Sequence, residues 1–241
     1  MKNKKVKYIL GLLTIMLIAV ISISNKTVFA DLFNKDEIQE KQMQIISTKD
    51  RNDVFLNLGE ALNKAVIPGN ELIIAYVNDE PIFLNEFNYY KTFDQQKAKE
   101  LNELVPNNRI IFDQLVKRKI NVELAKKQGL YPSEKDINNY INEQKEMMKN
   151  KEMSNDLFYI LKGWQISENE YFDLMKGIWA DSIAISNWFE RNYAPLLSIT
   201  EDQEKDEKAN EIVMQNSKVE IVEQQKLAKI VITDGGRELG L

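Results

Sequence analysis

The residue types that most enzymes need for proton or group transfer are scarce in this chain of 241 residues. It contains no histidine and no cysteine. The absence of histidine excludes histidine-based catalytic triads, zinc sites of the His-Glu-x-x-His kind and imidazole proton shuttles. The absence of cysteine excludes disulfide bonds and a lipid-modified cysteine at an export site. The sequence shows no recognisable catalytic machinery, and we expect neither a cofactor nor a metal ion.

Carboxylates are the remaining candidates for chemistry, since the chain has 37 acidic residues. Glu168 and Glu170 follow Ser167 in a capping-box pattern, so we expect them to cap a helix. The acidic run over residues 201–207 lacks the spacing of a metal-binding loop and is typical of a solvated helix face. Asp234-Gly235-Gly236 lacks the strand, the helix and the Lys-Ser/Thr that a phosphate-binding loop needs. None of these segments predicts a catalytic site.

Aromatic and methionine side chains are more informative, because they can make adaptable apolar contacts with an unfolded polypeptide. The chain has 3 tryptophans, 10 phenylalanines, 9 tyrosines and 8 methionines, more aromatic residues than thin helical layers hide easily. Met147 and Met148 are adjacent on a predicted helix, so we expect at least one of them to be exposed. The alternative, which the sequence leaves open, is that the aromatic residues widen the core face. The polypeptide-contact residues that we predict are Trp164, Trp179, Trp188, Met147 and Met148.

The first thirty residues have the layout of an export signal. Four lysines within residues 2–7 precede an apolar run from Tyr8 to Ile23, and Val28-Phe29-Ala30 offers a signal-peptidase site. The alternative is a retained membrane anchor over residues 7–24, although a run of 16 residues is short for a spanning helix. Both interpretations place the remaining chain outside the cytoplasm, secreted or anchored to the outer face of the cytoplasmic membrane.

The charge of the remaining chain limits its partners. Residues 1–30 contain five lysines and no acidic residue, so setting them aside changes the formal net charge from −5 to −10. An acidic body argues against nucleic acid as a partner, because phosphate contacts need a basic surface. A composition of 44% hydrophobic and 29% charged residues is that of a globular protein with enough apolar material for a core.

Hydrophobic periodicity predicts a mostly α-helical fold with a small antiparallel sheet formed by strands distant in sequence. Short apolar runs predict strands over residues 72–77 and 81–83, and residues 229–233 fit a further strand. Lys218 to Glu223 alternates polar and apolar residues, which is typical of a half-buried strand. We expect helices within residues 31–66, from Asn85 to before Pro106, and over about 108–128, 133–148, 156–162, 167–189 and 201–216.

Several segments resemble the SurA/PrsA family of extracytoplasmic chaperones. Tyr76 to Ile82 followed by Asn85-Glu86-Phe87 is similar to that family's opening "VNGEPIT…EF" pattern. Leu115 to Leu130 is similar to its "LI-x-x-KLL-x-x-x-AKK-x-G" helix. Ser133 to Ile137 and Ile166 to Tyr171 continue the likeness, which covers roughly residues 71–193.

The resemblance implies a SurA N-terminal-like helical module whose first strand pairs with a strand from the far end of the chain. We predict that Lys218 to Glu223 is this returning strand. In the family, a parvulin-type prolyl isomerase domain usually lies between the last long helix and that strand. Here only about twenty residues separate Pro195 from Lys218, and the histidines typical of the isomerase site are absent. The expected organisation is an export segment (1–30), an N-terminal helical segment (31–70), the chaperone-like domain (71–223) and a loose C-terminal tail (224–241).

The function that the resemblance implies is ATP-independent binding of unfolded or partly folded exported polypeptides. Two alternatives stay open. One is a non-catalytic envelope or spore-layer adaptor with one fixed protein partner. The other is a foldase of the prolyl isomerase family with residual activity.

Overall fold

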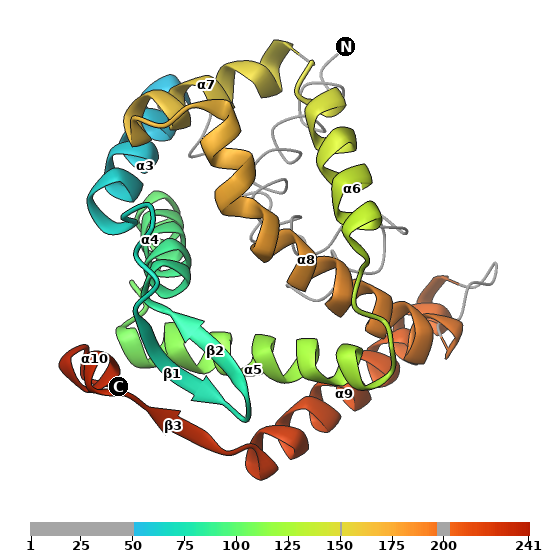
Figure 1. Cartoon of the computed structure of the whole chain (residues 1–241). Helices are drawn as coiled ribbons and strands as arrows, with labels where there is room; N and C mark the ends of the chain where they lie inside the picture. The colour runs from blue at the N-terminus through green and yellow to red at the C-terminus, as the bar shows by residue number, and fades with distance from the viewer. Residues whose placement is uncertain (1–50, 150, 197–202) are drawn as a thin grey trace.

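The computed structural model describes residues 51–149, 151–196 and 203–241. Within these ranges the chain is mostly helical, with eight α-helices and one three-stranded antiparallel sheet (Figure 1). This confirms the predicted fold class. The predicted export segment and the first helical stretch, before residue 51, lie outside the described residues. In chain order the elements are α3 (Arg51–Ala65), β1 (Ile73–Val77), β2 (Glu80–Phe83), α4 (Leu84–Leu101), α5 (Asn108–Lys127), α6 (Glu134–Met147), α7 (Lys151–Trp164), α8 (Glu168–Asn192), the 3₁₀ turn η1 (Ala194–Leu196), α9 (Gln203–Leu227), β3 (Ile230–Ile232) and α10 (Asp234–Glu238).

Helices α3 and α7 form a parallel pair whose backbones approach closely. A Cβ atom on Gly59 would lie well under 3.0 Å from the carbonyl oxygen of Ile160, and one on Gly163 would meet the α3 backbone equally closely. Glycine is therefore needed at both positions of the crossing. At the start of the pair, Arg51 Nε donates to Oδ1 of the buried Asp156 at 2.8 Å. The segment before β1 is thus fixed to the fold through α3.

The larger hydrophobic core lies where α3, α4, α7 and α8 meet. Its aromatic rings contact one another edge to face, for example Tyr171 and Trp179 with ring centroids 6.0 Å apart. Such contacts add to the stabilisation from burial itself. The members of this core that are at most 1% exposed are Leu62, Ile160, Trp164, Tyr171, Met175 and Trp179.

Helix α8 is the longest element in the centre of the molecule (Figure 1) and begins at the predicted capping box. Ser167 Oγ accepts from the backbone N–H of Glu170, and Glu170 Oε2 accepts from the backbone N–H of Ser167 at 2.7 Å. The helix supplies Met175 to the larger core. Further along, it supplies Trp188 and Phe189 to a small core shared with α5. Because α8 contacts several neighbouring helices, it needs apolar residues around much of its circumference.

The sheet has the strand order β2-β1-β3, with β1 antiparallel to both neighbours. A tight turn joins the two strands predicted over residues 72–77 and 81–83, and Asn78 adopts a φ of 53° there, which asparagine tolerates. Ala75 and Val77 face inward and pack in a core with residues of α4 and α5. Tyr76 lies on the outward face, between Pro81 on β2 and Val231 on β3.

The prediction that residues 218–223 form the returning strand is wrong. They belong to the last turns of α9, and the returning strand is β3, which pairs with β1. Six residues of alternating pattern fit both periods, since Val219 and Val222 are also three apart along a helix. No proline or glycine interrupts the chain between Gln203 and Leu227, so the helix continues through the alternating stretch.

The prediction of a loose C-terminal tail is also wrong. Thr233 caps α10, its Oγ1 accepting from the backbone N–H of Gly236, and the same hydroxyl donates to the carbonyl of Ile73 at 2.8 Å. Asn108 Nδ2 donates to the carbonyl of Leu239 at 2.8 Å. Leu239 and Leu241 pack against the core beneath the sheet. The domain therefore extends past residue 223 to include β3 and α10.

Asn85, the predicted start of this helix, lies inside α4 and does not cap it. The helix begins at Leu84, directly after β2, and its N-cap Phe83 makes no side-chain capping bond. The Asn85 side chain instead binds the loop before β1, because its Nδ2 donates to the carbonyls of Ile67 at 2.6 Å and Asn70 at 3.0 Å. The direct strand-to-helix transition thus leaves this side chain free to fix a neighbouring loop.

Candidate functional site

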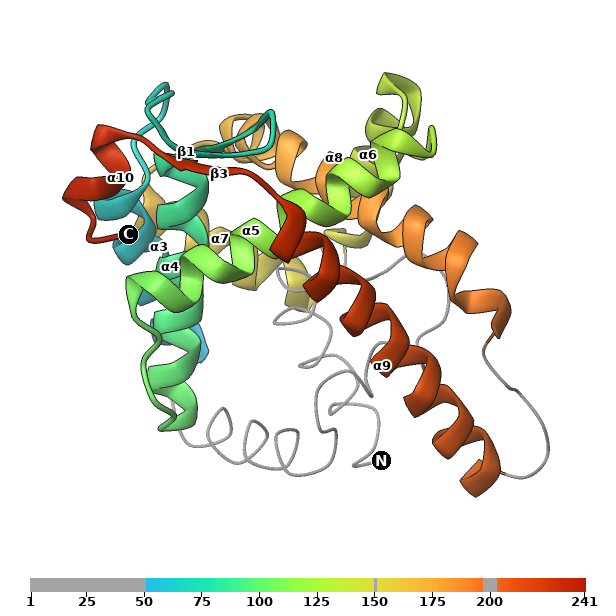
Figure 2. The same cartoon turned by 90° about the horizontal axis from the view of Figure 1, so that it is seen from below.

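Exposed apolar side chains follow α9 and continue into β3, and we call residues 203–232 the α9–β3 arm. Figure 2 shows α9 crossing α5 and leading into β3. Of the fifteen exposed large hydrophobic residues in the described part of the chain, six lie on this arm. Contiguous apolar patches are uncommon on monomeric proteins and often mark binding surfaces. The arm is therefore the strongest candidate, with Ile212, Val219, Val222, Leu227, Ile230 and Val231 exposed.

The exposed residues of α9 do not lie on the face that packs against the rest of the molecule. Val213 and Ile221 pack against the small core around Trp188. At about 100° per residue, Ile212 and Val219 project from the opposite side of the helix, with Val222 beside them. Helix α9 thus has two apolar faces, of which the described residues cover only one.

The three tryptophans predicted to contact a polypeptide are buried. Trp164 and Trp179 are each 1% exposed and Trp188 is 2% exposed. Trp164 stacks near Tyr89, with ring centroids 6.4 Å apart, and Trp179 lies 5.8 Å from Tyr140. A polypeptide cannot reach these rings in this conformation. The structure therefore corrects the prediction and favours its alternative, that the aromatic residues widen the core, because α8 is covered on several sides.

The two methionines differ in their surroundings. Met147, at the end of α6, is 42% exposed, whereas Met148 is partly buried and packs against the larger core. This agrees with the expectation that the adjacent pair is not buried together. Figure 1 shows the end of α6, to which Met147 belongs, at the top and β3 at the bottom, so these two ends of the molecule are separate. The predicted contact residues do not form one site.

A buried ionic cluster joins α4, α5 and α8, and we call Glu86, Arg118, Lys119, Asp181 and Ser182 the polar junction. Lys119 Nζ lies 3.0 Å from Glu86 Oε2 and 3.2 Å from Asp181 Oδ2. Burial lowers the pKa of Lys119, but the two carboxylates outweigh it, so the pKa lies above its ordinary value. Burial raises the pKa of Glu86, and Lys119 offsets this only in part, because Asp181 shares the same ammonium group.

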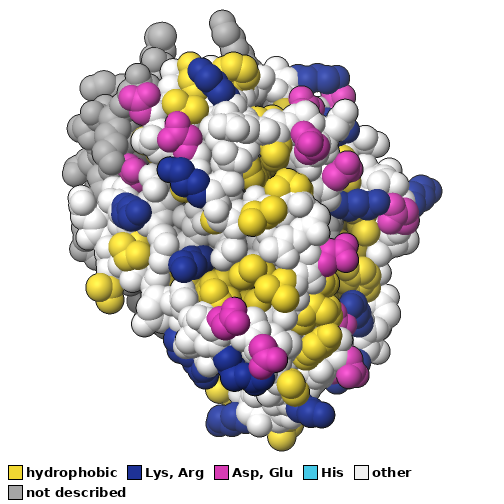
Figure 3. All heavy atoms as spheres, turned by 60° about the vertical axis from the view of Figure 1, so that its left-hand side comes forward, with side chains coloured by type: hydrophobic (Ala, Val, Ile, Leu, Met, Phe, Trp, Pro, Cys, Tyr) yellow, Lys and Arg dark blue, Asp and Glu magenta, His cyan; other side chains and the backbone are white. Residues whose placement is uncertain are grey.

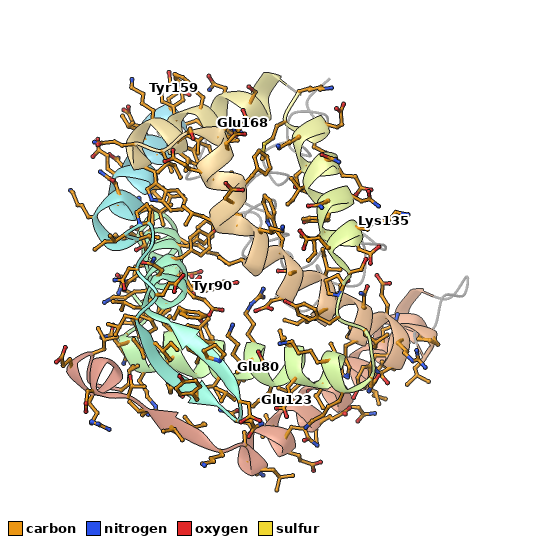
Figure 4. The ribbon with its side chains drawn as sticks, in the orientation of Figure 1. Glu80, Tyr90, Glu123, Lys135, Tyr159 and Glu168 are labelled. Carbon is orange, nitrogen blue, oxygen red and sulfur yellow. The ribbon has the colours of Figure 1, made fainter. Side chains whose placement is uncertain are left out.

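Arg118 extends the polar junction along α8. Its Nη2 donates to the carbonyl of Ile178 at 2.7 Å and to Ser182 Oγ at 2.8 Å. Its guanidinium carbon lies 5.5 Å from the ring centroid of Tyr90, which Figure 4 shows on the side of α4 turned toward α5 and α8. Within the described residues, Arg118 Nε and the Tyr90 hydroxyl have no hydrogen-bond partner. Three helices are thus held together by charge and hydrogen bonds as well as by apolar packing.

The polar junction does not have the arrangement of a catalytic site. A lysine that acts as base or nucleophile needs a lowered pKa, whereas that of Lys119 is raised. The hydroxyl of Tyr131 donates to Asp181 Oδ1 at 3.3 Å, and burial together with Asp181 raises the pKa of this phenol to about 12. Among the described residues, no group of three potential metal-ligating side chains lies together. We therefore interpret the junction as structural.

The sequence prediction missed the polar junction, although a signal for it exists. Arg118 and Lys119 follow Leu115 by three and four residues, so they fall on the same helical face as that buried leucine. Both side chains are nearly buried. Cations within an apolar stripe indicate buried acidic partners, since an unpaired buried charge is too costly. The partners Glu86 and Asp181 have no comparable signal in their own segments.

No helix in the described ranges combines the length and the apolar character needed to cross a bilayer. Residues 7–24, the predicted anchor, lie outside those ranges. The chain matches no protein-family model, no curated protein and no solved structure.

Proposed function

We propose that this chain is an extracytoplasmic, ATP-independent chaperone-like module that binds unfolded or partly folded exported polypeptides. The observation that carries the proposal is the uncovered apolar face of the α9–β3 arm. Unfolded chains expose apolar segments, and burying them against this face removes both surfaces from water. The export layout of residues 1–30 and the likeness of residues 71–193 to the SurA/PrsA family support the same function.

The arm suits reversible binding better than permanent burial. Its exposed apolar residues are separated by charged ones such as Glu223 and Lys226, which are also exposed. Aliphatic side chains such as Val219 and Leu227 offer apolar area without directional contacts, so they accept many sequences. A net charge of −5 for the whole chain favours solubility of a complex with an apolar segment. Release then needs no nucleotide, because each contact is weak.

One observation favours the adaptor as a second candidate. Six of the fifteen exposed large hydrophobic residues in the described ranges lie on this one arm, so a single fixed partner could cover them. The two functions differ in selectivity. An adaptor has a saturable site for one protein and ignores unfolded model proteins, whereas a chaperone is competed by many unfolded chains.

Light scattering tests the proposal directly. A reduced, unfolded secretory protein is allowed to aggregate with increasing amounts of the purified chain, and we expect suppression near equimolar ratio. The double variant Val219→Ser/Val222→Ser should lose much of the suppression, because both residues lie on the uncovered face of α9. Phe158→Ser is the matched control, since Phe158 is 58% exposed on α7, outside the arm. Circular dichroism checks that all variants fold. No suppression by the unmodified chain at several-fold excess would refute the proposal.

A further inference from the structure

The pattern of hydrogen bonds between β1 and β3 determines which backbone groups of β3 face away from β1. Asn78 N–H donates to the carbonyl of Lys229 at 2.7 Å, and Thr233 N–H donates to the carbonyl of Ile74 at 3.0 Å. In an antiparallel ladder, residues alternate between those bonded to the partner and those whose N–H and C=O point away. Lys229 and Thr233, on either side of β3, are bonded to β1. By alternation, Val231 also faces β1, whereas Ile230 and Ile232 point away from it. Their backbone groups therefore lie on the open edge of the sheet.

The opposite edge of the sheet is blocked by a proline. Val77 pairs with Glu80 across the tight turn, and Ala75 pairs with Ile82, so these pairs carry the β1–β2 hydrogen bonds. Pro81 lies between them, at the position whose backbone nitrogen points outward. Since proline has no N–H and its ring fills that direction, this edge cannot accept another strand at Pro81.

The β3 edge is blocked at one of its two outward residues only. Arg237 Nη1 donates to the carbonyl of Ile232 at 3.0 Å and occupies that acceptor. Among the described residues, no comparable group binds the backbone of Ile230. An unpaired N–H and C=O on an edge strand form a ready template for another chain. The open position is thus limited to Ile230 and the neighbouring N–H of Ile232.

The side chains of β3 at this open position are apolar. Two lysines precede the strand, and Asp234, which follows it, pairs with Arg237. Ile230 and Val231 are 39% and 42% exposed and project to opposite faces of the sheet. Figure 3 shows one face of the molecule, on which hydrophobic side chains gather in the lower centre among charged ones. Lys226 and Lys229, just before β3, are both exposed. An extended apolar segment with an acidic flank therefore complements this edge in hydrogen bonding, hydrophobicity and charge.

We propose that β3 is the place where an extended apolar segment of a bound polypeptide adds as a fourth strand, pairing with Ile230. The inference rests on the proposed function of the α9–β3 arm and specifies how the arm takes its partner. Backbone hydrogen bonds depend on an extended conformation and not on the side chains, so many polypeptides can pair here. Val231 and the neighbouring lysines should favour apolar segments with acidic flanks. The bond from Arg237 keeps the pairing short, which keeps binding reversible.

Amide exchange in the unmodified full chain tests the inference most directly. The probe is a short synthetic peptide of alternating valine and threonine with glutamate at both ends. The N–H groups of Val231 and Thr233 already face β1, so peptide should add protection at Ile230 and Ile232 alone within β3. A peptide with lysine ends should bind more weakly by fluorescence anisotropy, and added salt should reduce the difference. Saturating peptide that protects neither Ile230 nor Ile232 overturns the inference.

Substitutions at the edge give an independent measurement. Ile230→Pro reproduces at this edge the block that Pro81 forms at the other, and loss of a backbone hydrogen bond corresponds to about tenfold weaker peptide binding. Ile230→Thr keeps the N–H and the β propensity, so it is the matched control and should bind within about threefold of the unmodified chain. Arg237→Ala frees the carbonyl of Ile232 and should tighten binding. Equal binding by the proline and threonine variants contradicts strand addition.

The outcomes separate the inference from the proposed function. If Val219→Ser/Val222→Ser abolishes the suppression of aggregation and Ile230→Pro leaves it intact, the proposed function stands and strand addition at β3 is overturned. If the peptide pairs with Ile230 but the chain does not suppress aggregation, strand addition at β3 stands and general chaperone activity is overturned. A dimer in sedimentation that Ile230→Pro dissociates would show that a second copy of the chain occupies the edge, which also overturns the inference.

Discussion

Replacing Lys119 by methionine tests whether the polar junction stabilises the contact between α4, α5 and α8. Lys119 is the shared cation of Glu86 and Asp181, and the three side chains are 9%, 10% and 13% exposed. Methionine keeps most of the apolar stem but leaves two carboxylates without that cation. Breaking a buried ion pair costs about 3–5 kcal/mol. Because solvent screens these groups little, we expect the free energy of unfolding of Lys119→Met to fall by about 3 kcal/mol or more.

The pH dependence of this loss separates electrostatics from packing. Burial already raises the pKa of Glu86, and removing Lys119 should raise it further. A carboxyl whose folded-state pKa exceeds its unfolded value of about 4.3 adds stability below that value and loses it as the pH rises through the folded pKa. Lys119→Met should therefore regain stability, relative to the unmodified chain, as the pH falls from neutral toward that unfolded value. Conversely, the raised pKa of Lys119 means that the stability contributed by this lysine is present below about pH 10.4 and lost as the pH rises through its folded pKa.

Urea unfolding followed by tryptophan fluorescence measures both effects. Lys135→Met on α6 is the control, because Lys135 is exposed and should change stability by no more than about 0.5 kcal/mol. Adding Glu86→Gln to Lys119→Met should recover part of the loss at neutral pH, since it removes one of the two unpaired carboxylates. A cost below about 1 kcal/mol for Lys119→Met, well under that of a broken buried pair, would refute the reasoning. A loss that does not change with pH would refute its electrostatic part.

Three further substitutions test the helix contacts by the same measurement. Gly59→Ala should lower the free energy of unfolding by about 1–3 kcal/mol or more, because its Cβ would overlap the carbonyl of Ile160 where α3 crosses α7. Gly177→Ala in α8 is the matched opposite case: nothing lies within 4 Å of the added Cβ, so the better helix propensity of alanine should stabilise the chain by about 0.5–1 kcal/mol. Equal signs for the two glycines would contradict the close α3–α7 crossing. Ser167→Ala removes the capping box of α8 and should cost about 1 kcal/mol, and an unchanged urea midpoint would show that the first turn of α8 is held by packing alone.

The helices were predictable wherever local chemistry marks both ends. Ser167 caps α8 as predicted, and Ser133, at the start of the helix predicted over about 133–148, caps α6, each within a reciprocal capping box. Gly129, with a φ of 67°, directly follows both the helix predicted over about 108–128 and the C-cap of α5. These signals depend on residues within one turn of each other, so a single sequence contains all the information they need.

The candidate site was much less predictable, because exposure depends on neighbours far away in the sequence. Trp179 and Met147 both lie on predicted helices, yet Trp179 is covered by distant helices and Met147 is not. The same holds for Lys119, whose partners are 33 residues before it and 62 residues after it. Periodicity gives the apolar face of one helix but not how many other helices surround it.

The error in the returning strand and the location of the candidate site have one physical cause. Because α9 continues through residues 218–223 to Leu227, little chain remains between its end and Thr233, and the returning strand has only the three residues of β3. This short strand pairs with β1 and forms the edge of the sheet, so Ile230 lies at the open edge. The alternating segment that was predicted as a strand becomes helix, so Val219 and Ile221 project to different sides of α9. One of them joins the small core and the other is exposed. The continuation of α9 thus produces the uncovered apolar face, and the helix ends just before the open edge strand β3 on the α9–β3 arm.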